Sequence, residues 1–422
     1  MTTQKPTWIP LLVLLAVAVL ALFTTSVPGT MPTEGLDTGD TAWMIVASGL
    51  VLLMTPGLAY FYGGMVNHKN VISTMLQSFI AMGVISVIWI VFGFSLAFGD
   101  SLGGWIGDPR TFFMFNGVFD HKLSLGSADQ LKFTIPFALF AFFQMKFAVI
   151  TPALISGALA ERINFRAFVL FMVLFCIVVY APLAHWTWHP DGFLFNLGVL
   201  DFAGGTVVHM SAGWAALAGA LILGPRIGKY TKEGKTVPFM ASNLPLATLG
   251  TFILWMGWFG FNGGSQLAMG SIGDVADISR IFANTNAAAA AGSIAALILT
   301  QLLYKKPDLT MVLNGALAGL VAITAEPLTP TLGSASIIGA IGGVIVVFGV
   351  PLLDKLKIDD VVGAIPVHLF AGIWGTIAVV FTNSDASLST QLYSIIVVGL
   401  FTFIASAILW YILKSVSGIR VS

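Results

Sequence analysis

Eleven apolar stretches, each close to the ~20 residues with which a helix crosses a bilayer, divide this chain. They cover residues 41–62, 72–98, 131–157, 166–186, 202–224, 239–262, 279–303, 309–326, 333–353, 362–382 and 391–414. Only 9% of all residues are charged, whereas a soluble globular domain carries roughly a quarter. Because hydrocarbon offers backbone groups no hydrogen-bond partners, such stretches satisfy them internally as helices. The sequence therefore predicts an all-α polytopic membrane protein with 11 transmembrane helices.

The distribution of basic residues predicts the orientation of these helices. Thirteen Lys and Arg residues fall in one alternating set of connections and after the last stretch, against four in the other set. Basic residues favour the cytoplasmic side. We therefore expect the mature N-terminus outside and the C-terminus inside, in the cell (inner) membrane. The net charge is zero and no basic cluster indicates a nucleic-acid partner.

Residues 1–30 stand apart from the expected transmembrane domain, residues 38–422. Lys5 precedes an apolar run over 9–23, and small and turn-forming residues follow it. This arrangement is typical of a secretory signal peptide or of an uncleaved signal anchor. The single Cys176 excludes a disulfide within the chain and disfavours a thiol-ligated metal.

Two stretches of the chain repeat one pattern. Asp201 and His209 are separated by seven residues, as are Asp360 and His368, and each His is followed by two residues and Ala-Gly. Their spans would cross in opposite directions, so 41–224 and 239–382 form an inverted 5+5 repeat with one helix appended. Eight residues place each imidazole about 12 Å deeper than its Asp. Inverted repeats with a site at the midplane are typical of secondary transporters.

The two histidines are the first candidates for function. A single intramembrane His commonly only joins two helices, but a pair at equal depth in a repeat indicates a solute pathway. Neutral imidazole both donates and accepts hydrogen bonds. We interpret the two aspartates as helix N-caps. The other histidines are expected at the surface; they are His68, His121, His185 and His189.

Aromatic side chains gather in the segments 142–147, 185–188 and 255–265. In a chain with 33 Phe and 11 Trp, packing or an interfacial belt explains any one of these segments, and composition does not select among them. An aromatic cage with a hydroxyl at its edge would, however, attract a small cation.

Several motifs resemble the ammonium transporter family, which includes the methylammonium permeases and is related to the Rhesus proteins. The clearest is Asp-Phe-Ala-Gly-Gly-Thr-Val-Val-His over 201–209. Pro-Gly-Leu-Ala-Tyr-Phe-Tyr-Gly-Gly over 56–64, Gly-Ala-Leu-Ala-Glu-Arg over 157–162 and Gly-Trp-Phe-Gly-Phe-Asn over 257–262 agree with it. The resemblance extends over about 41–420.

The resemblance implies a role for each matching residue. Phe147, Trp188 and Ser265 match a site that recruits ammonium. Phe143, Phe147 and Phe261 match a phenyl gate below it. His209 and His368 match the pair that lines the pore, and Asp201 matches an acidic residue that supports the recruitment site. The family's members are transporters without cofactor, metal or catalytic residues, and they assemble as homotrimers.

The implied function is recruitment of ammonium outside, its deprotonation, and passage of ammonia past the histidines. A Rhesus-like electroneutral ammonia or gas channel and a non-conducting ammonium sensor remain alternatives, and a bis-histidine haem protein would also carry paired His on two helices.

Two features depart from the family. Lys146 lies within an expected span without an evident partner. The chain stops at Ser422, whereas members commonly have a longer tail that responds to the PII signalling protein, which disfavours such regulation.

Overall fold

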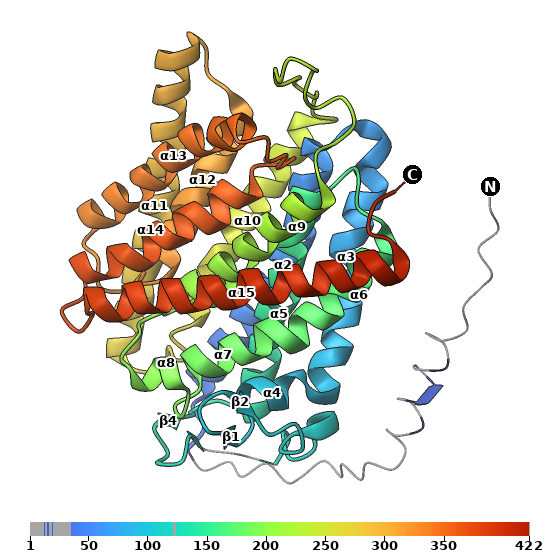
Figure 1. Ribbon diagram of the computed structural model, residues 1–422. Helices are drawn as coiled ribbons and strands as arrows, with labels where there is room; N and C mark the ends of the chain where they lie inside the picture. The colour runs from blue at the N-terminus through green and yellow to red at the C-terminus, as the bar shows by residue number, and fades with distance from the viewer. Residues whose placement is uncertain (1–11, 13–14, 17–18, 20–34, 121–123, 422) are drawn as a thin grey trace.

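The computed structural model describes residues 35–120 and 124–421, together with positions 12, 15, 16 and 19. The expected signal segment, residues 1–30, otherwise lies outside the described residues, as does His121. The described chain is a bundle of helices (Figure 1). The helices are α2 Thr38–Met65, α3 Val71–Ile88, α4 Phe94–Phe98, α5 Phe137–Leu159, α6 Phe165–Phe175, α7 Ala181–Trp188, α8 Phe193–Asn196, α9 Ser211–Leu223, α10 Leu244–Gly264, α11 Ile272–Tyr304, α12 Leu309–Thr324, α13 Leu332–Lys355, α14 Ala371–Ala378 and α15 Leu388–Ser417.

Four π-helical turns continue these helices: η2 Trp89–Gly93, η4 Cys176–Tyr180, η5 Gly205–Met210 and η6 Pro366–Phe370. Short 3₁₀ turns occupy η1 His68–Asn70, η3 Phe113–Phe115 and η7 Val379–Phe381. Turns of π-helix inside α-helices are rare and often mark functional sites. Two of the four carry the repeated histidines.

Within the described residues, nine helical segments are long and apolar enough to cross a membrane. They are Thr38–Met65, His68–Phe98, Phe137–Leu159, Phe165–Asn196, Gly205–Leu223, Leu244–Gly264, Ile272–Tyr304, Leu332–Lys355 and Leu388–Ser417. Two shorter apolar helices cover Leu309–Thr324 and Pro366–Phe381. Each coincides with one of the apolar stretches of the sequence. The chain is therefore an all-helical polytopic membrane protein, as predicted.

The expected start of the third stretch, at 131, is wrong by six residues. Short strands β1 Ser101–Leu102 and β2 Ile106–Gly107 pair with each other, as do β3 Ser124–Leu125 and β4 Leu131–Lys132. The helix α5 begins only after Pro136. The strands and α8 gather at one end of the bundle, the lower end in Figure 1. We call this the strand-bearing end.

Glycines bring several helices into direct backbone contact. A β-carbon at Gly250 of α10 would lie 2.2 Å from the backbone nitrogen of Phe61 in α2. In α12 and α13, β-carbons at Gly319 and Gly343 would lie 2.3 Å from the carbonyl of Ala288 and 2.2 Å from that of Gly292, both in α11. Small residues that permit such close backbone contact are typical of helix packing in membrane proteins.

Both histidine-bearing helices begin with the same capping arrangement. The carboxylate of Asp201 accepts hydrogen bonds from the backbone N–H groups of residues 204–207, and that of Asp360 accepts them from residues 363–365. Each Asp is followed three residues later by a glycine with positive φ, at +114° for Gly204 and +83° for Gly363. A left-handed turn at these positions requires glycine. The structure confirms both aspartates as caps.

A buried ion-pair network joins the connections at the opposite end of the bundle. The Arg226 guanidinium donates to both carboxylate oxygens of Asp359, each at 2.9 Å, and to Glu161 at 2.8 Å. Arg162 donates to the Asp359 carbonyl oxygen at 2.7 Å. Burial raises the pKa of the Asp359 carboxyl, but the hydrogen bonds and charge of Arg226 outweigh it and hold the pKa below its ordinary value. Arg226 and Asp359 therefore tie three connections of the chain together.

Replacing the Asp359 carboxylate should destabilise the bundle. Asp359→Asn removes one of the two carboxylates that balance the buried Arg226 and leaves Glu161 as its remaining charged partner. It should cost about 2 kcal/mol of folding stability, measured as a lowered unfolding midpoint in detergent. Because the pKa of Asp359 is depressed in the folded state, its contribution is present above about pH 4 and lost as the pH falls through the folded value. The Asp359→Asn variant should not show this loss of folding stability at acid pH.

A matched control lies nearby. Asp354 pairs with Lys229 at 3.0 Å, with 29% of its side chain exposed, so Asp354→Asn should cost less than about 1 kcal/mol. Equal midpoints for the two variants would contradict this account of the network.

Candidate functional site

The two repeated histidines meet at the centre of the bundle. Their Nδ1 atoms are 3.2 Å apart, and the rings lie nearly parallel with an interplanar angle of 10°. His209 is 1% exposed and His368 5%. A hydrogen bond between two Nδ1 atoms needs one donor and one acceptor. One ring is therefore protonated at Nδ1 and the other is not, which excludes two imidazolium ions in this geometry.

Two glycines make this approach feasible. A β-carbon at Gly213 would lie 2.5 Å from the backbone nitrogen of Leu369, the residue after His368. A β-carbon at Gly372 would lie 3.2 Å from the side chain of Met210, the residue after His209. Each His-x-x-Ala-Gly sequence thus places its glycine against the other histidine's segment. This reciprocal crossing is the structural reason for the repeated Ala-Gly.

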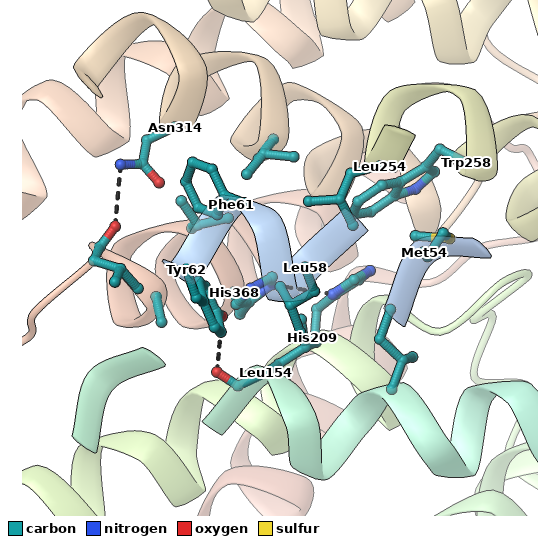
Figure 2. A pocket seen from close by; sticks show the side chains of 15 residues that line it. Met54, Leu58, Phe61, Tyr62, Leu154, His209, Leu254, Trp258, Asn314 and His368 are labelled. Atoms are coloured by element: carbon teal, nitrogen blue, oxygen red, sulfur yellow. Dashed lines mark hydrogen bonds between the residues drawn. The ribbon is translucent and has the colours of Figure 1, made fainter. Parts of the chain in front are cut away.

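A narrow apolar cavity surrounds the histidine pair (Figure 2). Its volume of about 10 Å³ is close to the smallest that admits one water molecule. Aliphatic and aromatic side chains form most of the lining, which includes Leu58, Phe61 and Leu254. Tyr62 and Asn314, also in the lining, donate to carbonyl oxygens of Leu154 and Val362 at 2.9 and 3.1 Å. The Nε2 atom of His209 has no hydrogen-bond partner among the described residues and is free for a solute.

The narrow cavity cannot hold a porphyrin. The two imidazoles bond directly to each other and leave no space for a metal-bearing ring between them. The haem alternative therefore does not fit this site.

A column of aromatic rings connects the histidines to the strand-bearing end. Phe261 packs on His209 with ring centroids 5.7 Å apart, and Phe147 packs on Phe261 at 4.4 Å. Trp188 meets Phe147 edge-on at 5.9 Å. The ring centroids of Phe143 and Phe147 are 4.9 Å apart. Phe143 lines neither the narrow cavity nor the wide cavity at the strand-bearing end. The three expected gate residues are thus neighbours: Phe147 lines the wide cavity, Phe261 lies between Phe147 and His209, and Phe143 packs against Phe147.

A wide cavity of about 280 Å³ lies at the far end of this aromatic column, at the strand-bearing end. All three expected recruitment residues, Phe147, Trp188 and Ser265, line it. The Ser265 hydroxyl donates to the carbonyl oxygen of Phe261 at 2.8 Å, so the lone pairs of its oxygen remain available as acceptors. The site therefore combines two aromatic rings with a hydroxyl oxygen.

Asp201 lines the same cavity, but its carboxylate is occupied. It accepts four backbone N–H groups and the Thr206 hydroxyl. Its carbonyl oxygen accepts the Trp188 indole N–H at 2.8 Å. Asp201 thus orients the loop and the tryptophan rather than offering free oxygens.

Sequence reasoning missed three features of this region. Trp258 stacks on His209 with centroids 5.3 Å apart and an interplanar angle of 15°. Lys146 lies over the Phe142 ring at 5.6 Å, a cation–π contact that supplies the partner it lacked. Glu326, the only acid in the apolar stretch over 309–326, also lines the wide cavity. The presence of a single acid in an otherwise apolar stretch was the sequence signal that could have identified Glu326.

The assignment of His185 and His189 to the surface is wrong. They are 0% and 2% exposed. His185 hydrogen-bonds the Ala97 carbonyl at 2.9 Å and the Ser101 hydroxyl at 2.8 Å, and His189 stacks on its ring. Ala97 and Ser101 lie more than 80 residues from His185, so the local sequence does not show these contacts.

A bundle of membrane-crossing helices with a wide cavity at one end and a narrow apolar cavity at its centre is the architecture of a membrane transport protein. Comparison with known proteins identifies the family within this class. A model of the Ammonium Transporter Family matches residues 42–422. The chain belongs to the ammonium transporter family.

Individual relatives agree over nearly the full length. A putative ammonium transporter of Methanothermobacter thermautotrophicus is 40% identical over 404 residues, which cover 92% of this chain and 94% of that protein. A solved structure described as a sensor Amt protein matches with a TM-score of 0.84 and 36% identity, covering 91% of this chain and 95% of the other. Mep2 of Saccharomyces cerevisiae matches with a TM-score of 0.81 and 29% identity, covering 92% and 88%.

The glycine crossing yields a stability prediction. Gly213→Ala forces a β-carbon into the backbone of Leu369 and should lower the folding stability by about 2 kcal/mol. Gly372→Ala meets a flexible Met side chain and should cost less. Thermal unfolding in detergent measures both. Gly83→Ala, on the exposed face of α3 with open space around it, is the control and should not lower the midpoint, because Ala favours a helix more than Gly does. A Gly213→Ala midpoint equal to that of the control would contradict the crossing.

Proposed function

We propose that this protein transports ammonium across the cell (inner) membrane. The cation binds in the wide cavity, loses its proton at the aromatic barrier, and crosses the narrow cavity as ammonia. The observation that carries this proposal is a hydrogen-bonded histidine pair in an apolar cavity, directly behind a barrier of packed phenyl rings. The membership of the ammonium transporter family supports it independently.

The wide cavity suits a small cation with N–H donors. The rings of Trp188 and Phe147 offer negative π faces, and Ser265 offers a hydroxyl oxygen. We propose these three residues as the recruitment site, Asp201 as its structural support, and Phe147 and Phe261 as the gate with Phe143 packed behind Phe147. An ammonium ion in this cavity can donate to Ser265 while it faces the two rings.

Selection against potassium follows from removal of the proton. Ammonium and potassium resemble each other in size and charge, so a size filter would separate them poorly. Transfer of an unpaired charge into an apolar cavity costs several kcal/mol or more, and desolvation favours the neutral form of an amine. Ammonium can lose its charge by losing a proton, and potassium cannot.

The histidine pair offers a route for that proton. His209 lies directly below Phe261, and its Nε2 atom is free. In our proposal His209 Nε2 accepts the proton as the N–H bond of ammonium breaks. His209 Nδ1–H then donates to His368 Nδ1, and His368 releases its Nε2 proton toward the opposite end. One positive charge crosses for each ammonia molecule, so transport is electrogenic.

We further propose the arrangement of the chain in the membrane. Eleven spans form an inverted repeat of five plus five with one helix appended, with the N-terminus outside and the C-terminus inside. The direct contacts of α2 with α10 and of η5 with η6, which join equivalent helices of the two halves, support the repeat. The relationship to the family supports a homotrimer with one pore in each subunit.

Replacing either histidine should abolish this route. Purified protein in a lipid bilayer should give an ammonium-dependent current. His209→Leu and His368→Leu should reduce that current about 100-fold, the magnitude typical of a lost acid–base group. His68→Leu, at an exposed histidine outside the cavity, should leave it unchanged. A wild-type protein without current would refute the electrogenic route, and unchanged currents in both Leu variants would reject the pore assignment.

A further inference from the structure

Glu326 occupies a position in the wide cavity that the recruitment residues do not explain. It lies two residues beyond the end of α12 and is 8% exposed. It lines the same cavity as Trp188, Phe147 and Ser265. A carboxylate beside an aromatic cage at the end of an apolar helix is costly unless it is paired or binds a cation.

The hydrogen bonds of Glu326 leave part of its carboxylate open. Its Oε1 accepts from the backbone N–H groups of Leu328 at 3.0 Å and Thr329 at 3.2 Å. Its Oε2 accepts from the Asn383 amide at 2.8 Å. An ionised carboxylate has about four acceptor sites, so one remains. Asp201, in contrast, accepts five hydrogen bonds and has none to spare.

The charge of Glu326 is also uncompensated. All three donors are neutral groups. The ion pairs between described residues involve Asp108, Glu161, Asp354 and Asp359 as the acids, and Glu326 is not among them. A net negative charge in a partly enclosed cavity concentrates cations there.

The backbone fixes Glu326 relative to the recruitment site. The Phe202 N–H donates to the Ala325 carbonyl at 2.8 Å, and the Ala203 N–H donates to that of Thr324 at 3.2 Å. The loop that follows Asp201 is thereby tied to the segment that carries Glu326. Because the Trp188 indole is held by the Asp201 carbonyl, the tryptophan and the glutamate are positioned by one connected unit.

We propose that Glu326 is the charged ligand of the wide cavity, where its open carboxylate site binds one monovalent ammonium or methylammonium ion beside the rings of Trp188 and Phe147. This inference rests on the proposed function and adds the residue that determines affinity for the cation. A single carboxylate balances one positive charge, which matches a monovalent ammonium-type solute. Asp201 orients the site, and Glu326 supplies its charge.

Glu326→Gln tests the inference because it removes the charge and keeps the shape. In proteoliposomes, the KM for ammonium-driven uptake or current should rise about tenfold at low ionic strength, with the maximal rate unchanged. The wild-type KM should rise with added salt as the charge is screened, and that dependence should flatten in the variant. Asp385→Asn, at an exposed acid two residues from Asn383, is the matched control and should behave as wild type.

The outcomes separate the two proposals. A wild-type protein that transports no ammonium refutes the proposed function itself. Transport by wild type with an unchanged KM and salt dependence in Glu326→Gln overturns the present inference alone, as does a lower maximal rate at unchanged KM. If Glu326→Gln does not fold, the wild-type protein still decides, because a KM independent of ionic strength would contradict a charged ligand in the cavity.

Discussion

The hydrogen bond between the Nδ1 atoms of His209 and His368 is the interaction on which the centre of this protein depends. It requires two helices from distant parts of the chain to cross at backbone contact, which Gly213 and Gly372 permit. It also requires each imidazole at a defined depth, which the two Asp-capped turns and the π-helical segments set. Each of the two helices therefore contributes a glycine, an Asp cap and a π-helical turn to the contact between the histidines. Its polar atoms lie in a cavity too small and too apolar for a hydrated ion.

Charge is separated along the proposed path. The wide cavity holds Glu326 and Asp201 beside aromatic rings, whereas no Asp or Glu among the described residues lines the narrow cavity. Phe147 and Phe261 lie between the two regions. A cation is therefore favoured on one side of the barrier and disfavoured on the other. This difference in environment, more than the size of any opening, accounts for the proposed choice of a solute that can lose its charge.

Much of this arrangement could be predicted from the sequence, because hydropathy and repetition are local signals. The apolar stretches located the helices, and the repeated Asp-x7-His pattern predicted that two histidines meet near the midplane. The recruitment residues, the gate residues and the supporting role of Asp201 followed only from the family resemblance. The structure brings these residues together around the wide cavity and the aromatic column.

The remaining features depend on contacts between distant residues. The burial of His185 arises from Ala97 and Ser101, and the late start of α5 arises from the pairing of β3 with β4. The π-turns have no composition that marks them. Glu326 and Asp201 look alike in the sequence, since both are single carboxylates next to apolar helices. Only their hydrogen bonds to distant residues and to the backbone distinguish them.

Uptake of radiolabelled methylammonium into proteoliposomes, with potassium as the competitor, tests the central claim most directly. The claim is that the solute is selected because it can give up a proton. The account predicts uptake well above that of protein-free liposomes, competition by unlabelled ammonium, and no inhibition by a large excess of potassium. Inhibition by potassium in proportion to its concentration, or the absence of any protein-dependent uptake, would contradict it.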